Sequence, residues 1–214
     1  HVLACATRLL DRGFFRIGSE DYAVTNQSYG LATMRKEHLS CRGETLQFDY
    51  PAKSGKRRVQ AVVDPEVASV LATLKRRRGG GDELLAFKRS GRWRDIKSPD
   101  INEYLKAVTG LDVSAKDFRT WGATVIAAVA LAVTEPTVTS KFARKRAIMR
   151  AVREVAYYLG NTPAVARASY IDPRVFDRYR DGTTIRPALG EIAADGDITA
   201  IQGPAEKAVL DLLE

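Results

Sequence analysis

The chain has 214 residues, of which 45% are hydrophobic and 28% are charged, so it can build a hydrophobic core and is neither disordered nor fibrous. Its 34 Lys and Arg residues against 26 Asp and Glu give a net charge of +8 and a pI near 9.6, which favours a polyanionic partner. Residues 1–187 alone carry 33 basic and 20 acidic side chains, a net charge of +13, whereas residues 188–214 carry six acidic and one basic. We therefore predict a basic domain over residues 1–187 and an acidic C-terminal segment over residues 188–214, packed on that domain or extending from it.

Cysteine content and hydropathy argue against a disulfide-rich or cysteine-based metal protein and against a membrane-spanning protein. Cys5 and Cys41 lie 36 positions apart, without a Cys-x-x-Cys pattern, which supports neither a disulfide framework nor a cysteine-based metal site. The longest uncharged stretch, residues 120–134, is too short to span a membrane and is typical of a buried helix. We expect a cytoplasmic protein without a membrane span. Because the chain begins at His1 without a leader-like segment, we also expect it to be a fragment of a longer protein.

The first half of the chain predicts helices and one β-hairpin. Apolar spacing, β-rich runs and cap signals give, in chain order, a helix over residues 1–11 capped by Gly13, strands over residues 45–50 and 57–63, and a helix from Asp64-Pro65 to residues 75–78. The two strands flank a turn cluster with Pro and Gly, so they form a hairpin with Lys53 in its loop.

Helices dominate the second half. The pattern predicts them over residues 98–108, 116–133, 137–159, 163–169, 172–180 and 204–213. The predicted fold class is therefore α+β, mainly α, with a small antiparallel sheet. Six basic side chains line one face of the helix over residues 137–159, which makes residues 141–153 a candidate surface for the polyanionic partner; an exposed face without a partner is the alternative.

Motifs for nucleotide and metal chemistry are missing. The chain has no phosphate-binding glycine loop, no Gly-x-Ser-x-Gly elbow and no His-Glu-x-x-His, so we predict neither a cofactor nor a metal. We interpret His38, the one realistic histidine candidate, as structural. What remains is Arg and Lys beside glycines and aromatic residues, which suits phosphate oxygens, although each such cluster alone is more often an exposed surface.

Five segments in order carry a resemblance to a family. They are Phe15-Arg16-Ile17-Gly18 followed by Tyr22; Tyr29-Gly30-Leu31-Ala32-Thr33-Met34-Arg35 with His38; Lys53; Lys116-Asp117-Phe118-Arg119-Thr120-Trp121-Gly122; and Leu159-Gly160-Asn161-Thr162-Pro163 with Ser169-Tyr170. On these residues the chain resembles the type IB DNA topoisomerases of the small bacterial and poxvirus-like branch, over most of residues 1–181. The resemblance implies the helical catalytic domain shared by these enzymes and tyrosine recombinases, with a small antiparallel sheet that carries a lysine hairpin.

The resemblance also implies an active site and a reaction. Tyr170 would attack a DNA phosphodiester to give a 3′-phosphotyrosine and a free 5′-hydroxyl, and Lys53 would protonate the leaving oxygen. The other implied groups bind phosphate or DNA and are Arg16, Arg119, Asn161, Lys116 and Tyr22. Guanidinium groups suit this chemistry because they stay charged and hold phosphate oxygens bidentately while negative charge develops. The implied enzyme is a nucleoid-associated monomer that relaxes supercoiled double-stranded DNA without ATP, cofactor or metal.

This sequence departs from the family's pattern at one position and leaves alternatives open. Many relatives have histidine where this chain has Asn161, whose amide can donate a hydrogen bond but carries no charge. A buried aromatic residue is the alternative for Tyr22. Family members of this branch carry a small β-rich domain before the catalytic one, and we expect that domain to be absent from this chain and DNA binding to be weaker without it.

Two other functions remain open at this point. A tyrosine recombinase shares the Arg, Lys, Arg and Tyr chemistry, but recombinases usually place histidine where this chain has Lys116. A noncatalytic DNA-binding module would have no need for the intact set of Arg16, Lys53, Arg119 and Tyr170.

Overall fold

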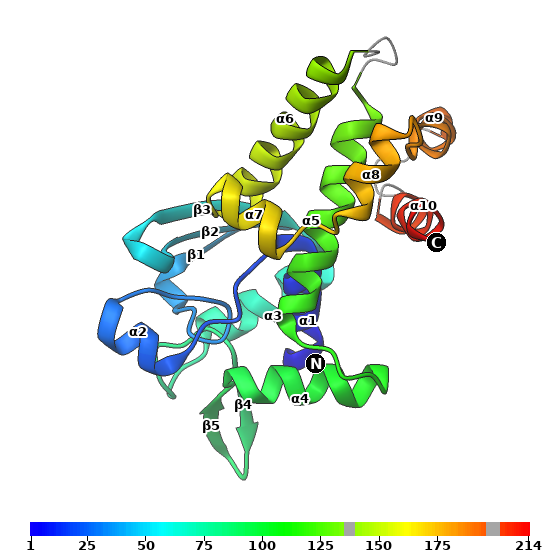
Figure 1. The fold of residues 1–214 in the computed structure, drawn as a ribbon. Helices are drawn as coiled ribbons and strands as arrows, with labels where there is room; N and C mark the ends of the chain where they lie inside the picture. Colours follow the sequence, from blue (N-terminus) through cyan, green and yellow to red (C-terminus); the bar gives the residue numbers. More distant parts are fainter. Residues whose placement is uncertain (135–139, 196–201) are drawn as a thin grey trace. The chain divides into compact units, whose positions relative to one another are not determined.

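Contacts divide the chain into two units, His1–Arg119 and Thr120–Glu214, and the computed structural model describes residues 1–134, 140–195 and 202–214 (Figure 1). The first unit combines helices with two small antiparallel sheets, and the described part of the second unit is helical. The predicted fold class, mainly α with a small antiparallel sheet, is therefore confirmed. The predicted boundary between residues 187 and 188 stays a prediction.

The first unit contains a three-stranded sheet, a two-stranded hairpin and the helices around them. Its elements are α1 (Val2–Gly13), α2 (Glu20–Asn26), η1 (Lys36–His38), β1 (Leu39–Arg42), β2 (Thr45–Pro51), η2 (Lys53–Gly55), β3 (Arg57–Val63), α3 (Pro65–Arg76), β4 (Ala86–Arg89), β5 (Arg92–Asp95), α4 (Ser98–Thr109) and the start of α5 (Ala115–Ala132). The sheet has the antiparallel order β1-β2-β3, and the predicted hairpin with Lys53 between its strands is present.

Alternation along β2 builds the core of this unit. Leu46, Phe48 and Tyr50 are buried on one face of the strand because side chains alternate between the two faces of a sheet. Phe15, from the loop after α1, packs edge-on against Phe48 with ring centroids 4.8 Å apart. Burial of each phenylalanine contributes about 2–3 kcal/mol of hydrophobic stabilisation. Because Phe15 immediately precedes Arg16, this core packing positions the first predicted phosphate-binding residue.

Two predicted helix ends can be compared with the structure. Asp64 caps α3 as predicted, since its Oδ1 accepts a hydrogen bond from the backbone N–H of Val67 at 3.0 Å. The prediction of Gly13 as the cap of α1 is wrong: the left-handed residue is Phe14, with φ of 51°. Gly13 is required by space instead, because a Cβ there would lie 2.2 Å from the ring of Phe15.

The described part of the second unit contains the rest of α5 and the helices α6 (Lys141–Leu159), α7 (Pro163–Ser169), α8 (Arg174–Arg180), α9 (Arg186–Asp195) and α10 (Gln202–Leu213). Part of the predicted start of α6, residues 137–139, lies outside the described residues. α10 joins the other helices through a hydrogen bond from Trp121 Nε1 to Glu206 Oε1 at 2.9 Å and through its buried residues Ala205, Val209 and Leu213. In the described parts of the chain, no helix combines the length and apolar character needed to cross a membrane.

Candidate active site

The loop that carries Arg16 is held against the turn at residues 29–33. Leu31 N–H donates to the carbonyl oxygen of Arg16 and Ala32 N–H donates to that of Ile17, both at 2.7 Å. The two backbones approach so closely that a Cβ at Gly30 would lie 2.4 Å from the backbone nitrogen of Gly18. Only glycine allows this approach, which explains why both glycines stand beside the predicted site residues.

The same turn also holds the hairpin that carries Lys53. Tyr29 N–H donates to the carbonyl oxygen of Pro51 at 2.8 Å, and the hydroxyl of Ser28 donates to that of Ala52 at 2.7 Å. Lys53 follows directly at the start of η2, where its side chain is exposed. Residues 28–33 therefore connect the backbone of the Arg16 loop to that of the Lys53 hairpin.

Arg119 joins this group from α5. Its side chain is buried, and its Nη1 donates a hydrogen bond to the carbonyl oxygen of Phe14, two residues before Arg16. Burial raises the pKa of Tyr50 on β2. The nearby charges of Arg58, Arg119 and Arg16 act in the opposite direction and lower it. The charges of three guanidinium groups of the first unit thus act on one buried phenol.

Arg58 belongs to a basic run after Lys53 but was not among the predicted site residues. It lies on β3 directly opposite Tyr50 on β2, is half-buried, and contacts Gln60, whose Nε2 donates to the carbonyl oxygen of Gly13 at 2.8 Å. The signal that could have found it is its position in the predicted hairpin, five residues after Lys53 and on the same face as the apolar residues of the strand pair.

The two predicted DNA-binding residues of the first unit are both exposed. Lys116 lies in the first turn of α5 and is exposed, whereas Arg119 on the next turn is buried, so the two side chains differ in their access to solvent. Tyr22 on α2 is 41% exposed, so the alternative of a buried aromatic residue is wrong. His38 has the contacts of a structural residue: it is buried, its Nδ1 accepts from Arg35 N–H at 3.1 Å, and burial lowers its pKa.

In the second unit, Asn161 and Tyr170 lie at the two ends of α7. α6 ends at Gly160, whose φ of 62° suits glycine, and Asn161 N–H closes the turn by donating to the carbonyl oxygen of Ala156 at 2.9 Å. Thr162 then caps α7, because its Oγ1 accepts from the backbone N–H of Val165 at 3.3 Å. Asn161 and Tyr170, nine positions apart in the sequence, are thus held at opposite ends of one capped helix.

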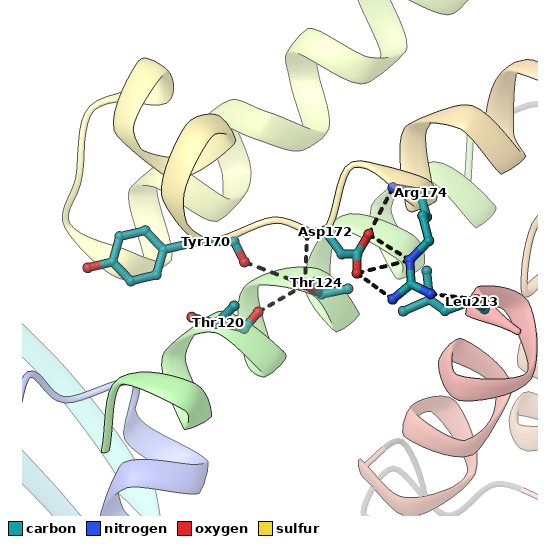
Figure 2. A network of polar contacts seen from close by, with 6 residues as sticks. All are labelled: Thr120, Thr124, Tyr170, Asp172, Arg174 and Leu213. Atoms are coloured by element: carbon teal, nitrogen blue, oxygen red, sulfur yellow. Dashed lines mark hydrogen bonds and ion pairs between the residues drawn. The ribbon is translucent and has the colours of Figure 1, made fainter. Parts of the chain in front are cut away.

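The backbone at Tyr170 is fixed to α5 by Thr124 (Figure 2). The hydroxyl of Thr124 accepts from Asp172 N–H at 3.1 Å and lies 3.4 Å from the carbonyl oxygen of Tyr170. Asp172 pairs with Arg174, which lowers the pKa of Asp172, and Arg174 Nη1 donates to the carbonyl oxygen of Leu213 at 2.8 Å. Figure 2 shows the half-buried ring of Tyr170 directed away from this network.

The structure therefore places the predicted residues in two sets. The first unit brings together the segments of Arg16, Lys53 and Arg119, and the second holds Asn161 and Tyr170 at the ends of one helix. Guanidinium groups, an ammonium group and a phenol suit the binding and transfer of a phosphoryl group. Among the residues that the structure describes, no three His, Cys, Asp or Glu side chains form a group that could hold a metal.

Comparison with known proteins agrees with these motifs. The family model described as eukaryotic DNA topoisomerase I, catalytic core, matches residues 1–186. The DNA topoisomerase 1B of Acanthamoeba polyphaga mimivirus is 26% identical over 173 residues, which cover 78% of this chain and 51% of the viral protein, so the chain spans about half the length of this relative. The resemblance to type IB DNA topoisomerases is confirmed, and the chain belongs to the DNA topoisomerase I catalytic-core family.

Proposed function

We propose that this chain is the catalytic part of a type IB DNA topoisomerase that relaxes supercoiled double-stranded DNA without ATP. The observation that carries the proposal is the family match over residues 1–186, which includes Arg16, Lys53, Arg119, Asn161 and Tyr170.

The proposed chemistry is a reversible transesterification. The hydroxyl of Tyr170 releases its proton to solvent as its oxygen attacks phosphorus and forms a 3′-phosphotyrosine, while the bond from phosphorus to the 5′ oxygen breaks. Lys53 gives a proton to that 5′ oxygen, which is otherwise a poor leaving group. The exposed position of Lys53 at the tip of its hairpin is compatible with approach to DNA.

Three other side chains stabilise the negative charge that develops on the nonbridging oxygens of the phosphate. Arg16 and Arg119 bind the nonbridging oxygens, and they are worth most in the transition state, where the negative charge on these oxygens is greatest. Asn161 donates an amide hydrogen bond to a nonbridging oxygen. Because the phosphotyrosine conserves the energy of the broken bond, the free 5′ end can swivel and then attack Tyr170 phosphate in the reverse reaction without ATP.

Around the cleavage site, Tyr22 and Lys116 contact the DNA backbone from exposed positions. The excess positive charge of residues 1–187 supports binding to the duplex, and affinity should fall steeply as salt rises. We further propose that the protein acts as a monomer, since one strand is cleaved by one tyrosine, and that it is found with the nucleoid.

Plasmid relaxation tests this function. The protein is incubated with negatively and, separately, positively supercoiled plasmid, in the presence of a chelator and without ATP. The variants are Tyr170→Phe and the matched control Tyr157→Phe, which removes the hydroxyl of a residue on α6 that is 82% exposed. We expect relaxation of both plasmids by the wild type and the control and none by Tyr170→Phe. Relaxation that survives in Tyr170→Phe, or that requires ATP, would overturn the proposal, and strand exchange between two duplexes would indicate a recombinase.

A further inference from the structure

The β4–β5 hairpin carries an arginine-rich face with no role in the reaction described above. Phe87 pairs with Arg94 and Arg89 pairs with Arg92 across the two strands. Because side chains alternate along a strand, these four residues project from the same face of the hairpin, and we call them the arginine face. All four are exposed, and Phe87 is 37% exposed.

Among the described residues, no acidic side chain forms an ion pair with this face. Across the residues that the structure describes, Arg89, Arg92 and Arg94 form no ion pair or hydrogen bond through their guanidinium groups. The one acidic residue of the hairpin, Asp95, projects from the opposite face and lies 3.8 Å from Arg77. Three like charges side by side on exposed strands repel one another, and an anionic partner would relieve this repulsion.

The base of the hairpin is firmly anchored in the first unit. Arg77 is buried, and its Nη1 donates to the carbonyl oxygens of Leu74 and Leu84 at 3.1 and 2.9 Å. Its guanidinium carbon lies 5.5 Å from the ring centroid of Trp93 on β5. Gly80 allows this packing, because a Cβ there would lie 2.8 Å from the Cβ of Trp93.

The tip of the hairpin is a tight turn. Ser90 and Gly91 form a two-residue turn in which both φ values are positive, 49° and 77°, as the tight connection of twisted strands requires. Figure 1 shows the hairpin extending from the body of the first unit, well apart from strands β2 and β3 that flank Lys53. The arginine face is thus presented on a preorganised ribbon, which lowers the entropic cost of binding.

We propose that the arginine face is a second binding surface for duplex DNA, separate from the cleavage site. The chemistry favours a nucleic acid over an acidic protein because three guanidinium forks suit closely and regularly spaced phosphates, and because a two-stranded ribbon has the width of the DNA major groove. The apolar ring of Phe87 lies among the arginines and can contact sugars or thymine methyl groups. The inference rests on the proposed function, since it assumes that DNA is the substrate.

The surface makes a quantitative prediction for salt dependence. Each arginine that neutralises one phosphate contributes about one unit to the slope of log affinity against log salt concentration. Arg89→Ala, Arg92→Ala and Arg94→Ala should each reduce the slope by about one, and the triple variant by about three. At physiological salt this corresponds to roughly fivefold weaker binding for each single variant.

Anisotropy titrations of a labelled duplex over a range of salt concentrations test this inference. The matched control is Lys88→Ala, which removes the same charge from the opposite face of the hairpin, where the ammonium lies 5.4 Å from the ring centroid of Trp93. We expect the control to keep the wild-type slope. A triple variant with the wild-type slope and an unchanged melting temperature would overturn the inference, as would a loss in Lys88→Ala equal to that in the arginine variants, or tighter binding of polyglutamate than of the duplex.

The failure of this inference can be told apart from a failure of the proposed function. Tyr170-dependent relaxation combined with wild-type DNA binding by the triple variant would refute only the arginine face. Reduced salt dependence in the triple variant without any Tyr170-dependent relaxation would refute only the proposed function.

Discussion

Arg119 donates a hydrogen bond from Nη1 to the carbonyl oxygen of Phe14, which lies 105 positions earlier in the sequence and two residues before Arg16. The left-handed conformation of Phe14, with φ of 51°, belongs to the turn that leads from α1 into the Arg16 loop. The two predicted phosphate-binding arginines are thus linked by a contact within the protein. One edge of the Arg119 guanidinium is used to hold the Arg16 loop, so the other donors of the same fork are oriented before any phosphate binds.

This contact predicts that lysine cannot replace Arg119. Arg119→Lys keeps the charge but loses the planar fork that could bind Phe14 and a phosphate at the same time. We expect the single-turnover rate of DNA cleavage to fall by about 100-fold or more, with little change in DNA affinity. Arg76→Lys on α3, where the arginine is exposed, is the control. A cleavage rate close to that of the wild type in Arg119→Lys would contradict this role.

The close approach of Gly18 and Gly30 predicts a cost for a single methyl group. In Gly30→Ala the new Cβ would lie 2.4 Å from one backbone atom of Gly18 and 2.7 Å from the carbonyl oxygen of Arg16, so the Arg16 loop must move. We expect a loss of about 1–3 kcal/mol in the free energy of unfolding and slower cleavage. Gly190→Ala on α9, where a Cβ meets open space, should be neutral or slightly stabilising in the same urea titration. Equal stability of the two variants would show that the loop is not confined at Gly30.

Asp64 predicts how stability depends on pH. Burial alone would raise the pKa of Asp64, but the hydrogen bonds from Val67 N–H and Arg8 and the charges of Arg8 and Arg12 outweigh it, so the pKa lies below its ordinary value. The ionised carboxylate therefore stabilises the folded state fully above the pKa of an unfolded aspartate, about 4, and this contribution is lost as pH falls through the folded pKa.

The variant that tests this is Asp64→Asn, which keeps a helix cap but removes the charge. We expect it to lower the free energy of unfolding by about 1–3 kcal/mol at neutral pH, and the difference from wild type to shrink in acid. Urea unfolding at several pH values measures this, with Asp21→Asn on α2, an exposed position, as the control. A difference that is independent of pH would contradict the assignment.

We predict that the side-chain amide of Asn161 contributes one hydrogen bond, but no charge, to DNA cleavage. Asn161→Ala removes that donor and should slow single-turnover cleavage by about 10-fold or more, whereas Asn161→His, which restores the residue that many relatives carry, should cleave at least as fast as the wild type. The backbone N–H of Asn161, which closes the end of α6, is retained in both variants. Equal cleavage rates in wild type and Asn161→Ala would exclude a role for this side chain.

Elements with strong local signals were predictable from the sequence. The β2–β3 hairpin and the cap of α3 follow from β-rich runs, a turn cluster and Asp64-Pro65, and α7 has the predicted bounds Pro163–Ser169. α2 was not predicted because none of its residues is buried, so it shows no apolar periodicity. The β4–β5 hairpin was also not predicted, because arginines rather than apolar residues alternate along its strands. The signal that could have indicated it is the two-residue turn Ser90-Gly91.

For the candidate site, the motifs identified the residues but not the contacts that these residues make in the folded chain. The approach of Arg119 to Phe14 and the position of Arg58 beside Tyr50 depend on contacts between distant segments and on the register of two strands. The close contact of Gly18 with Gly30 likewise requires the folded backbone, although both glycines stood in the quoted motifs. Propensity and periodicity describe each segment separately, so they could not locate these contacts.

Mass spectrometry of a trapped covalent complex tests the central claim most directly. The protein is incubated with a duplex in which the cleaved end diffuses away, denatured and digested. We predict one adduct, in which the oxygen of Tyr170 is joined to a 3′ phosphate and the departing strand has a free 5′-hydroxyl, and none with Tyr170→Phe. An adduct on another tyrosine such as Tyr157, a linkage to a 5′ phosphate, or the absence of any adduct on a duplex that the protein binds would contradict the account.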